Sequence, residues 1–570
     1  MTKTISHDVL IIGSGLAGLR AAIEISQRSE GKLSVGLVTK VHAMRSHSVC
    51  AQGGTAAVLR LDRGDSPEAH IFDTIKGSDY LADQDAVERL VALAPEEIYR
   101  LEHWGMPWSR ESDGRIAQRP FGGHSHPRGT FAEDRVGFYE MQTLYDTCLR
   151  YSNIQFYHEW FVTKLIVENG EFRGATAIEI KSGNFNAFKA RAGIIATGGA
   201  GRLYAFATYS HSSTADGLSM AYRAGIPLKD MEFVQFHPTG LVPSGVLITE
   251  GARGDGGYLI NRDGERFMKK YAPQKLELGP RDIVARSIAS EIRDGRGFRD
   301  ESGMDYVHLD LRHLGAEKIK ERLSDIREVC MKLRGIDPIE EPIPIRYVCH
   351  FTMGGIHANI DGATPVKGLW GAGEAACISV NGANRLGTNS TATCLVWGGI
   401  TGRAAAEYAK NHSAADLPEK PVIDEEKRIY DGIFHGAGGD NPYDVKHELE
   451  KTMDEHANVF RTEQGLKEAL KTIRALKQRM YQHVEDKSRE FNMNLINVLE
   501  LDSMLEVAEV VLTGAYARTE SRGAHFRLDF PKRDDAQWMK HTIATKTADG
   551  IRLEYAPVTV TRYQPQERTY

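Results

Sequence analysis

Short apolar runs followed by glycine-rich turns are the main repeated pattern up to about residue 400. They occur at residues 9–12, 35–39, 193–197 and 368–371. Apolar runs of this length between turn residues are typical of strands that a parallel sheet buries on both faces. A helical pattern follows the first run after a short turn, so we expect a strand, a turn and a helix in this order.

The pattern changes after residue 235. Charged helical segments at 282–293 and 316–334 indicate an inserted domain, and glycine-rich strand character returns near residue 350. The polar, proline-containing stretch 411–422 predicts a linker. From about 424 to 516 apolar residues recur at helical spacing, which predicts a helical bundle, and alternation over about 535–562 predicts strands. The clearest helical series is Leu466, Leu470, Ile473, Leu476 and Met480.

The flanks of the first apolar run do not fit a secretion signal. Asp8 precedes the run and Arg20 and Glu24 follow it, whereas the core of a signal peptide is uncharged. No run of about 18 uncharged apolar residues occurs in the sequence, and a membrane span needs about that length. We therefore expect neither a signal peptide nor a transmembrane segment.

Charge and composition restrict the possible partners. The chain has 570 residues, of which 71 are lysine or arginine and 77 are aspartate or glutamate, so its formal net charge is −6. No basic field is available to hold nucleic acid or an anionic membrane, so we expect no nucleic-acid partner. The 56 glycines are about 10% of the residues, above the average of about 7%, and they indicate many tight turns.

The cysteines predict no metal centre. They form no CxxC pair, and no histidines lie at metal-ligand spacing, which argues against structural zinc, c-type haem and an iron–sulfur cluster in this chain. We expect buried, reduced thiols and a cytoplasmic or matrix-type compartment. The six cysteines are Cys50, Cys148, Cys330, Cys349, Cys377 and Cys394.

A glycine motif at the first strand–helix junction predicts a dinucleotide site. The motif consists of Gly13, Ser14, Gly15, Leu16, Ala17 and Gly18. In such a turn the first glycine permits a tight bend, the second lets the backbone approach a pyrophosphate, and the third permits close helix packing. The second apolar run ends in Thr39 and Lys40, where NAD-binding folds carry an acidic ribose ligand. The absence of an acidic residue there, together with further glycine turns at 196–199 and 370–374, favours FAD over NAD as the cofactor.

A longer motif resembles a known family. Residues 45–54 read Arg-Ser-His-Ser-Val-Cys-Ala-Gln-Gly-Gly and resemble a segment of the flavoprotein subunits of succinate dehydrogenase and fumarate reductase. Further matches follow in the family's order at 118–123, 236–240, 249–254, 281–286, 350–355, 382–387 and 520–525, so the resemblance covers essentially the whole chain. A histidine taken alone is more often structural. The resemblance implies that His47 carries FAD covalently through its imidazole.

The pattern and the resemblance together predict an α/β fold. We expect a Rossmann-like FAD-binding domain that an α+β capping domain interrupts, followed by a helical bundle domain and a small C-terminal domain. The expected ranges are 1–235 and 350–410 for the FAD-binding domain, 236–349 for the capping domain, 423–530 for the helical domain and 531–570 for the C-terminal domain.

The resemblance implies that the substrate is succinate or fumarate. A four-carbon dicarboxylate must be held at both ends while a hydride passes to or from the flavin and a proton moves at the other carbon. Among the family-matched residues, the carboxylates would be held by His237, Thr249, His350 and Arg385, with Phe121 also at the substrate site.

Proton transfer would fall to Arg281. A guanidinium is normally never deprotonated, so it can act only within a relay that replaces its proton at once. Glu250 and Arg253 match the family's relay, although an ordinary i,i+3 ion pair is the alternative at this spacing. The resemblance assigns further cofactor contacts to Thr39, Lys40, Ser46, Gln52, Gly53, Gly54, Asp216, Glu374, Ser390 and Thr391. Asp216 would in addition suit a helix N-cap.

The sequence also bears on partners. Because the chain has no cluster or haem motif, its electrons must leave it, and the family implies an iron–sulfur subunit, one or more membrane anchor subunits and a quinone. We expect a peripheral location at the cytoplasmic face of the inner membrane. Two alternatives stay open: a soluble L-aspartate oxidase with noncovalent FAD, and a noncatalytic flavin-binding scaffold.

Different residues favour opposite directions of the reaction. The segment 124–136 is shorter than in the family, and Phe138 stands where many succinate dehydrogenases carry histidine, which with the motif at 350–355 favours fumarate reduction. Gln52 instead favours succinate oxidation. Direction depends on the potentials of the flavin, the clusters and the quinone, so interconversion is predicted.

Overall fold

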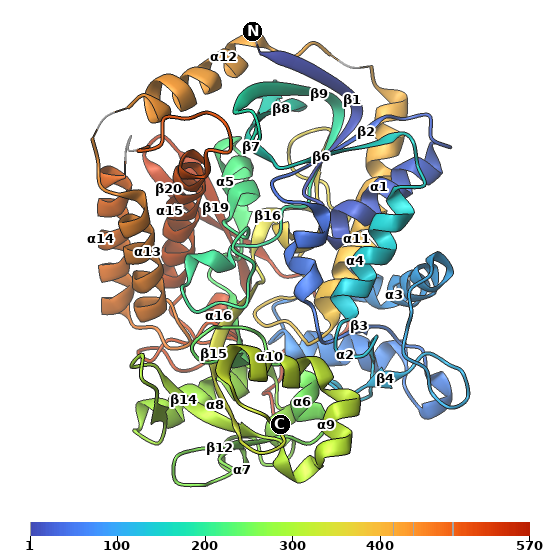
Figure 1. Ribbon diagram of the computed structural model, residues 1–570, viewed down its shortest axis with the longest axis vertical. Coiled ribbons are helices and arrows are strands. Elements are labelled where there is room, and N and C mark those ends of the chain that lie inside the picture. The colour runs from blue at the N-terminus through green and yellow to red at the C-terminus, as the bar shows by residue number, and fades with distance from the viewer. Residues whose placement is uncertain (1, 414, 437, 481–483, 570) are drawn as a thin grey trace.

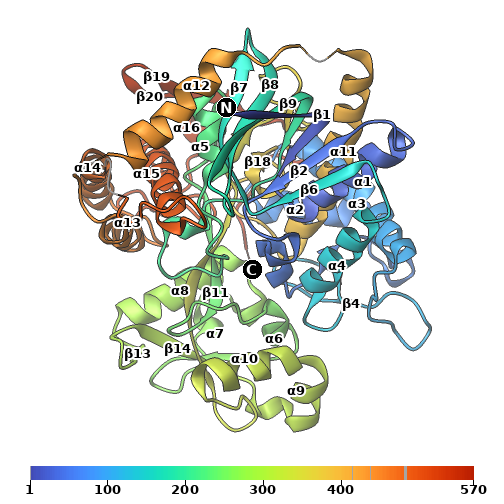
Figure 2. The same ribbon diagram turned by 45° about the horizontal axis from the view of Figure 1, so that its top comes forward.

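The structure is a computed structural model that describes residues 2–413, 415–436, 438–480 and 484–569. A seven-stranded sheet lies at the centre of its N-terminal half, with strand order β6-β2-β1-β9-β8-β7 and β17 also paired to β9 (Figures 1 and 2). The β1–β2, β1–β9, β2–β6 and β9–β17 pairs are parallel, whereas β7 and β8 add antiparallel strands. The strands are β1 (Lys3–Ile12), β2 (Val35–Thr39), β6 (Ile154–His158), β7 (Trp160–Glu168), β8 (Glu171–Glu179), β9 (Asn184–Ile195) and β17 (Leu369–Gly371).

The predicted buried strands are confirmed. Val9 and Ile11 of β1 face one hydrophobic core and Leu10 and Ile12 face another, so the sheet is covered on both sides. Helices cover the face of Val9 and Ile11, namely α1 (Leu16–Arg28), α3 (Gln84–Trp104), α4 (Val136–Cys148) and α11 (Asn389–Asn411). Burial of β-branched and leucine side chains on both faces explains why these runs carry no polar alternation.

The inserted segment folds around an antiparallel sheet of order β11-β15-β14-β12, with β13 paired to β14. Its first and last long strands pair from Val234 with Thr352 to Leu241 with Ile345, so this sheet extends beyond the expected range 236–349 at both ends. The elements are β11 (Val234–Leu241), α6 (Glu250–Gly254), β12 (Tyr258–Ile260), α7 (Met268–Tyr271), α8 (Arg281–Arg293), β13 (Phe298–Arg299), β14 (Asp305–Asp310), α9 (Ala316–Arg322), α10 (Ser324–Arg334) and β15 (Ile343–Thr352). We call this unit the capping domain.

The predicted helical region begins earlier than expected. α11 runs through Asn411 and α12 begins at Glu419, so helix occupies part of the expected linker 411–422, in which residue 414 lies outside the described residues. Residues 437 and 481–483 of the expected bundle also lie outside them. The helices are α12 (Glu419–Lys427), a π-helical turn (Arg428–Phe434), α13 (Pro442–His456), α14 (Glu463–Arg479) and α15 (Met493–Ala517).

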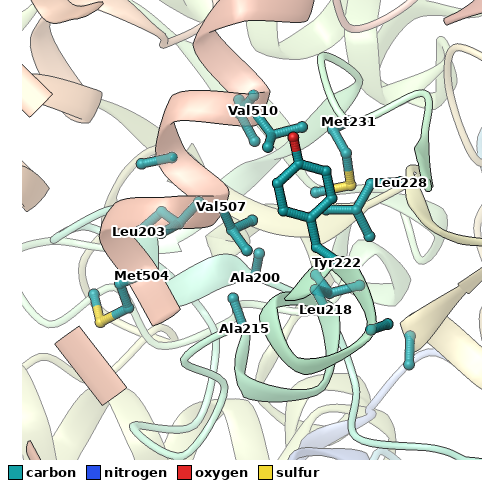
Figure 3. Packing of buried hydrophobic residues seen from close by; sticks show 14 of the residues in the cluster. Ala200, Leu203, Ala215, Leu218, Tyr222, Leu228, Met231, Met504, Val507 and Val510 are labelled. Carbon is teal, nitrogen blue, oxygen red and sulfur yellow. The ribbon is translucent and has the colours of Figure 1, made fainter. Parts of the chain in front are cut away.

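α15 joins the helical region to the central sheet. Figure 3 shows Val507 and Val510 of α15 beside Tyr222 and Leu218, which belong to α5 (Asp216–Arg223). These side chains lie within one core that also contains Leu10 of β1. Burial of each such side chain contributes roughly 1.5–3 kcal/mol, so the helical region is anchored firmly to the cofactor-binding half.

The predicted C-terminal strands form a hairpin, β19 (Lys540–Thr547) and β20 (Gly550–Pro557), preceded by α16 (Asp535–Trp538). The hairpin joins a sheet of order β18-β16-β10-β19-β20, whose other strands are β10 (Leu228–Lys229), β16 (Gly355–His357) and β18 (Ala376–Cys377). A three-stranded sheet consists of β3 (Thr55–Ala56), β5 (Gly129–Thr130) and β4 (Gln118–Arg119), and α2 (Pro67–Gly77) lies nearby in sequence. Among the helices of the described residues, none combines the length and apolarity that a membrane span requires.

Candidate functional site: a groove that opens into a cavity lined by arginine and histidine

The glycine turn lies at the carboxyl end of β1, as its motif predicts. Gly13 has φ +106°, and a Cβ there would lie 2.3 Å from the Ala196 carbonyl oxygen. A Cβ on Gly18 would lie 2.0 Å from the Gly13 carbonyl oxygen, which accounts for the close start of α1. Thr39 accepts a hydrogen bond from Ser14 at 2.9 Å, which ties the end of β2 to the turn.

This turn lines a groove of about 140 Å³ that runs past Lys40, Thr197 and Asp216. The Lys40 ammonium contacts carboxylate oxygens of Asp216 and Glu500, each at 2.6 Å. Burial opposes the charge on Lys40, but the two carboxylates outweigh it and raise its pKa. The ion cluster therefore fixes the groove wall against α15.

The prediction that Asp216 is a helix N-cap is wrong. The N-cap of α5 is Ala215, whose φ of +66° is left-handed, and Asp216 is the first helical residue. Its carboxylate accepts hydrogen bonds from Lys40 and Thr214 instead. Competition from the nearby ammonium explains the difference, because a charge-assisted bond is stronger than a neutral cap.

His47 lies where the groove meets a second, larger cavity. It begins a 3₁₀ turn (His47–Cys50), whose N-cap Ser46 accepts from the Ser48 amide at 3.3 Å. The His47 ring stacks on Tyr209 with centroids 4.7 Å apart, and its Nδ1 accepts from the Ser210 amide at 3.2 Å. Burial, and then the charge of Arg385, lower the pKa of His47 to about 4, so the imidazole is neutral at pH 7.

The prediction that all six cysteines are buried is wrong for Cys50. It is exposed at the end of the 3₁₀ turn and lines the large cavity, and Cys394 is half-buried. No residue of the turn His47–Cys50 is buried, because the whole turn lines the cavity. The other four cysteines are buried.

The large cavity has a volume of about 940 Å³ and lies between the capping domain and the domain of the central sheet. His237 on β11 and His350 on β15 face each other with ring centroids 4.9 Å apart. Arg281 begins α8, and Arg385 lies in the loop before α11. The predicted residues on its wall are Leu16, His47, Gln52, Gly53, Gly54, Phe121, His237, Thr249, Glu250, Arg281, His350, Glu374, Arg385, Ser390 and Thr391.

The expected relay residues are adjacent. The Glu250 carboxylate is 2.8 Å from Arg281 Nε and 3.7 Å from Arg253 Nη2. Gly122 donates its amide to Glu250 at 2.6 Å. Burial opposes the charge on Glu250, but Arg281 and Arg253 outweigh it and lower its pKa. Arg253 does not line the cavity itself and lies behind Glu250.

Two guanidiniums, those of Arg281 and Arg385, lie close together on the cavity wall. Burial, and then Arg281, lower the pKa of His237 far below 6.5, and the same causes lower the pKa of Arg385 to about 9. The His237 Nδ1 accepts from the Thr239 amide, so its proton sits on Nε2. A neutral imidazole donor and two guanidiniums beside one carboxylate suit a dianionic ligand.

Four residues that the sequence did not single out complete the site. Gln235 bonds both arginines, Thr208 bonds His350 Nδ1 at 2.8 Å, Tyr209 donates to Glu374, and Glu500 contacts Lys40. Gln235 lies two residues before His237 on a strand, and this spacing is a usable signal for a shared face. No local signal identifies Glu500, which lies in a distant helix.

The two spaces fit one long ligand. Their walls share Leu16, His47, Ser48, Glu374 and Cys394, so the groove leads into the cavity at His47. Buried polar atoms that lack a partner among the described residues include Thr197 Oγ1 in the groove and Gln52 Oε1, His237 Nε2 and Arg385 Nε in the cavity. Such atoms are expected where a ligand completes the hydrogen bonds. A dinucleotide with a flavin end at His47 matches this shape and these donors.

Two family models match this chain, and together they cover most of its length. A family model described as an FAD binding domain matches residues 8–391, and one described as the fumarate reductase flavoprotein C-terminal region matches 446–570. The chain is 45% identical to a fumarate reductase flavoprotein subunit of Mycobacterium tuberculosis, with all of both chains covered. It is 44% identical to a succinate dehydrogenase flavoprotein subunit of Rickettsia bellii, covering 98% of this chain and 97% of that one. The structure resembles E. coli quinol fumarate reductase FrdA with a TM-score of 0.97, 40% identity and 99% of each chain covered.

Proposed function

The chain belongs to the family of flavoprotein subunits of succinate dehydrogenase and fumarate reductase, and we propose that it interconverts succinate and fumarate on FAD bound covalently to His47. It is an oxidoreductase, and the FAD binding domain family model matches its residues 8–391, a range that includes the capping domain. One observation carries the finer proposal: the cofactor groove opens at His47 into a cavity lined by Arg281, Arg385 and two histidines.

The cofactor assignment is supported by the groove. The turn 13–18 would place its backbone amides at the pyrophosphate, and Lys40 and Asp216 would lie along the cofactor. Because Nδ1 of His47 accepts the Ser210 amide, Nε2 is the nitrogen left to bond the flavin. Glu374, Ser390 and Thr391 line the cavity. Burial raises the pKa of Glu374 to about 7.

The substrate assignment is supported by the donors of the cavity. Arg385 would hold one carboxylate, and the Nε2 proton of His237 would be donated to a substrate oxygen. His350 and Thr249 stand on the same wall, and Phe121 excludes water beside them. FAD held in the groove would supply the hydride acceptor or donor for one central carbon of the dicarboxylate.

Proton transfer at the neighbouring carbon is assigned to Arg281. In fumarate reduction Arg281 would donate its proton to that carbon. The ionised Glu250, 2.8 Å away, would accept a proton from Arg253 and pass it to Arg281, and water would restore the proton of Arg253. In succinate oxidation the proton moves outward through the same three groups. The contact of Glu250 with both guanidiniums is what lets an arginine act, because its proton is replaced at once.

We further propose that the electrons pass to an iron–sulfur subunit, which one or more membrane anchor subunits connect to a quinone. The solved relative with a TM-score of 0.97 is a quinol fumarate reductase, which supports a quinone-linked complex for this chain. The expected location is peripheral, at the cytoplasmic face of the inner membrane.

The first experiment tests the covalent bond and the reaction together. Holoprotein denatured in acid should keep flavin fluorescence on the protein band, and the His47→Ser variant should release all its flavin. The wild-type protein should reduce a dye with succinate. Flavin released entirely from the wild type would contradict the covalent bond and favour an L-aspartate oxidase type of enzyme. Covalent flavin without succinate turnover would favour a noncatalytic scaffold.

A further inference from the structure

A single buried amide connects the two guanidinium groups of the cavity. Gln235, on β11, is fully buried, and its Oε1 accepts from Arg281 Nη1 and from Arg385 Nη2, both at 3.2 Å. Its Nε2 donates to Asn384 Oδ1 at 2.9 Å and to the Arg385 carbonyl at 2.6 Å. An amide has two acceptor and two donor positions, and all four are used here.

These partners fix the orientation of the amide. If the oxygen and nitrogen of Gln235 exchanged places, its NH₂ group would face two guanidiniums that can only donate. Its oxygen would then face the carbonyl oxygen of Arg385. Only the observed orientation satisfies both sides, so Gln235 holds the loop that carries Arg385 and the first residue of α8 in one arrangement.

The link between the two arginines matters because both carry positive charge. The two groups that a dicarboxylate enzyme must address, a carboxylate and the adjacent carbon that exchanges a proton, are only one bond apart. Arg385 and Arg281 must therefore lie close together although both are positive, and their repulsion in a buried site is unfavourable. Arg281 has Glu250 as an ion-pair partner, whereas Arg385 has no carboxylate within 4.0 Å among the described residues.

We propose that Gln235 is a positioning residue that sets the separation of Arg281 and Arg385 and leaves their charge available to the substrate. This role rests on the proposed succinate–fumarate chemistry. A carboxylate at this position would pair with both guanidiniums and compete with the substrate. An apolar side chain would remove the acceptor that Arg281 Nη1 and Arg385 Nη2 share. A neutral amide avoids both consequences.

The test uses the holoenzyme with Gln235→Glu and Gln235→Leu. Malonate, a dicarboxylate without a reacting C–C bond, reports binding by calorimetry, and succinate with a dye gives kcat and KM across pH. Gln84→Leu is the matched control, because Gln84 is also fully buried and bonds the backbone of residues 561–563 far from the cavity.

Gln235→Glu keeps an acceptor for both arginines and should retain flavin. Its added charge should weaken malonate binding by about tenfold or more, since hydrogen bonds to charged groups have about that effect. It should also move the acidic limb of the succinate kcat profile to higher pH, because the new carboxylate holds the proton of Arg281 more tightly. Gln235→Leu should lower kcat by about 10- to 100-fold. Gln84→Leu should change neither malonate affinity nor the pH profile.

Each other result contradicts a defined statement. Malonate affinity within twofold of wild type and an unmoved pH profile in Gln235→Glu would overturn the positioning role, as would wild-type kcat in Gln235→Leu. If Gln235→Leu fails to retain flavin, Gln235→Glu decides. Wild-type protein that neither binds malonate nor oxidises succinate would overturn the proposed function, and the positioning role with it.

Discussion

Arg568, near the end of the chain, connects two buried carboxylates of different parts of the molecule. It contacts Asp282 at 2.6 Å and Asp79 at 3.0 Å. Asp282 lies on α8 directly after Arg281, and Asp79 follows α2. Residue 568 therefore lies against α8 of the capping domain. Replacing Arg568 by Met removes this connection while keeping most of the side-chain volume.

The expected loss follows from burial. Removing one partner of a buried ion pair costs about 3–5 kcal/mol, because the other charge stays buried and unpaired. Asp282 keeps Arg286 at 3.1 Å and Asp79 keeps Arg533 at 2.8 Å, so we expect a value of about 3 kcal/mol. With an unfolding entropy of about 2.1 cal/mol/K per residue, this lowers Tm by about 2–3 °C.

The pH dependence of this loss has a defined sign. Burial opposes the charges on Asp79 and Asp282, but the arginines, Arg568 first among them, outweigh it and lower both pKa values. The stabilisation is therefore present above about pH 4, where unfolded aspartate ionises, and is lost as pH falls through the lowered pKa values of the folded state. The Tm difference between the wild type and Arg568→Met should be full at pH 7 and shrink in acid.

Thermal unfolding followed by circular dichroism measures this effect. Arg552→Met is the control. The Arg552 side chain is 60% exposed and its ion pair with Glu554 is long, at 3.6 Å, so this pair contributes little to stability. Equal Tm values for Arg568→Met and Arg552→Met at pH 7 would refute the reasoning, and so would a Tm difference that persists unchanged below the pKa values of both aspartates.

Two further predictions concern turnover and alkaline stability. Arg281→Gln should lower succinate turnover by about 10²–10⁴-fold and retain flavin, because it removes the proton-transfer group. The same change at Arg286, one turn further along α8, should leave turnover nearly normal, and near-normal turnover in Arg281→Gln would reject its role. Burial opposes a charge on His541, but Asp230 at 2.7 Å and Asp83 at 3.2 Å raise its pKa to about 9, so its stabilisation is full below pH 6.5 and lost as pH rises through 9. His541→Gln should therefore lower Tm at pH 6 and converge with the wild type near pH 10, and a Tm difference independent of pH would contradict this assignment.

The fold was predictable where the cause is local. Residues 9–12 and 193–195 form strands, because a run of branched apolar residues is stable where a sheet is covered on both faces. The predicted run 193–197 continues for two residues beyond the end of β9 at Ile195. The predicted helix 316–334 is instead two helices, α9 and α10, separated at Leu323. Leu323 is buried in the capping core, and its φ of −133° interrupts the helix. Helical spacing of charged residues does not reveal such a tertiary requirement.

The site was predictable residue by residue, but its internal contacts were not. Motif matches located His47, Arg281 and Arg385, which the structure brings to one cavity. The partners that orient them come from distant segments, as Gln235 does for both arginines. Asp216 illustrates the same limit, because a local cap signal was outweighed by Lys40, which is far away in sequence. Pairings of this kind depend on the closed fold.

The partners of buried arginines separate structural from functional ones in this chain. Arg20 and Arg518 are fully buried and bond carboxylates, Glu97 and Glu24 for the first and Glu232 and Glu520 for the second. Among the described residues, Arg385 bonds only neutral groups, Ser390 at 2.9 Å and Gln235 at 3.2 Å, and it stacks 4.3 Å above Phe351.

Neutral partners alone do not mark a functional arginine. Arg119 also lacks a carboxylate partner among the described residues, but it donates to the backbone carbonyls of Gln52 and Gly53 and so holds the loop after His47. Arg385 differs because its Nε has no partner among those residues and its side chain lines the cavity. Keeping a buried cation without a counterion is unfavourable, and this cost is offset only when an anion binds. The position of Arg385 is therefore intelligible only for a protein whose ligand brings the negative charge.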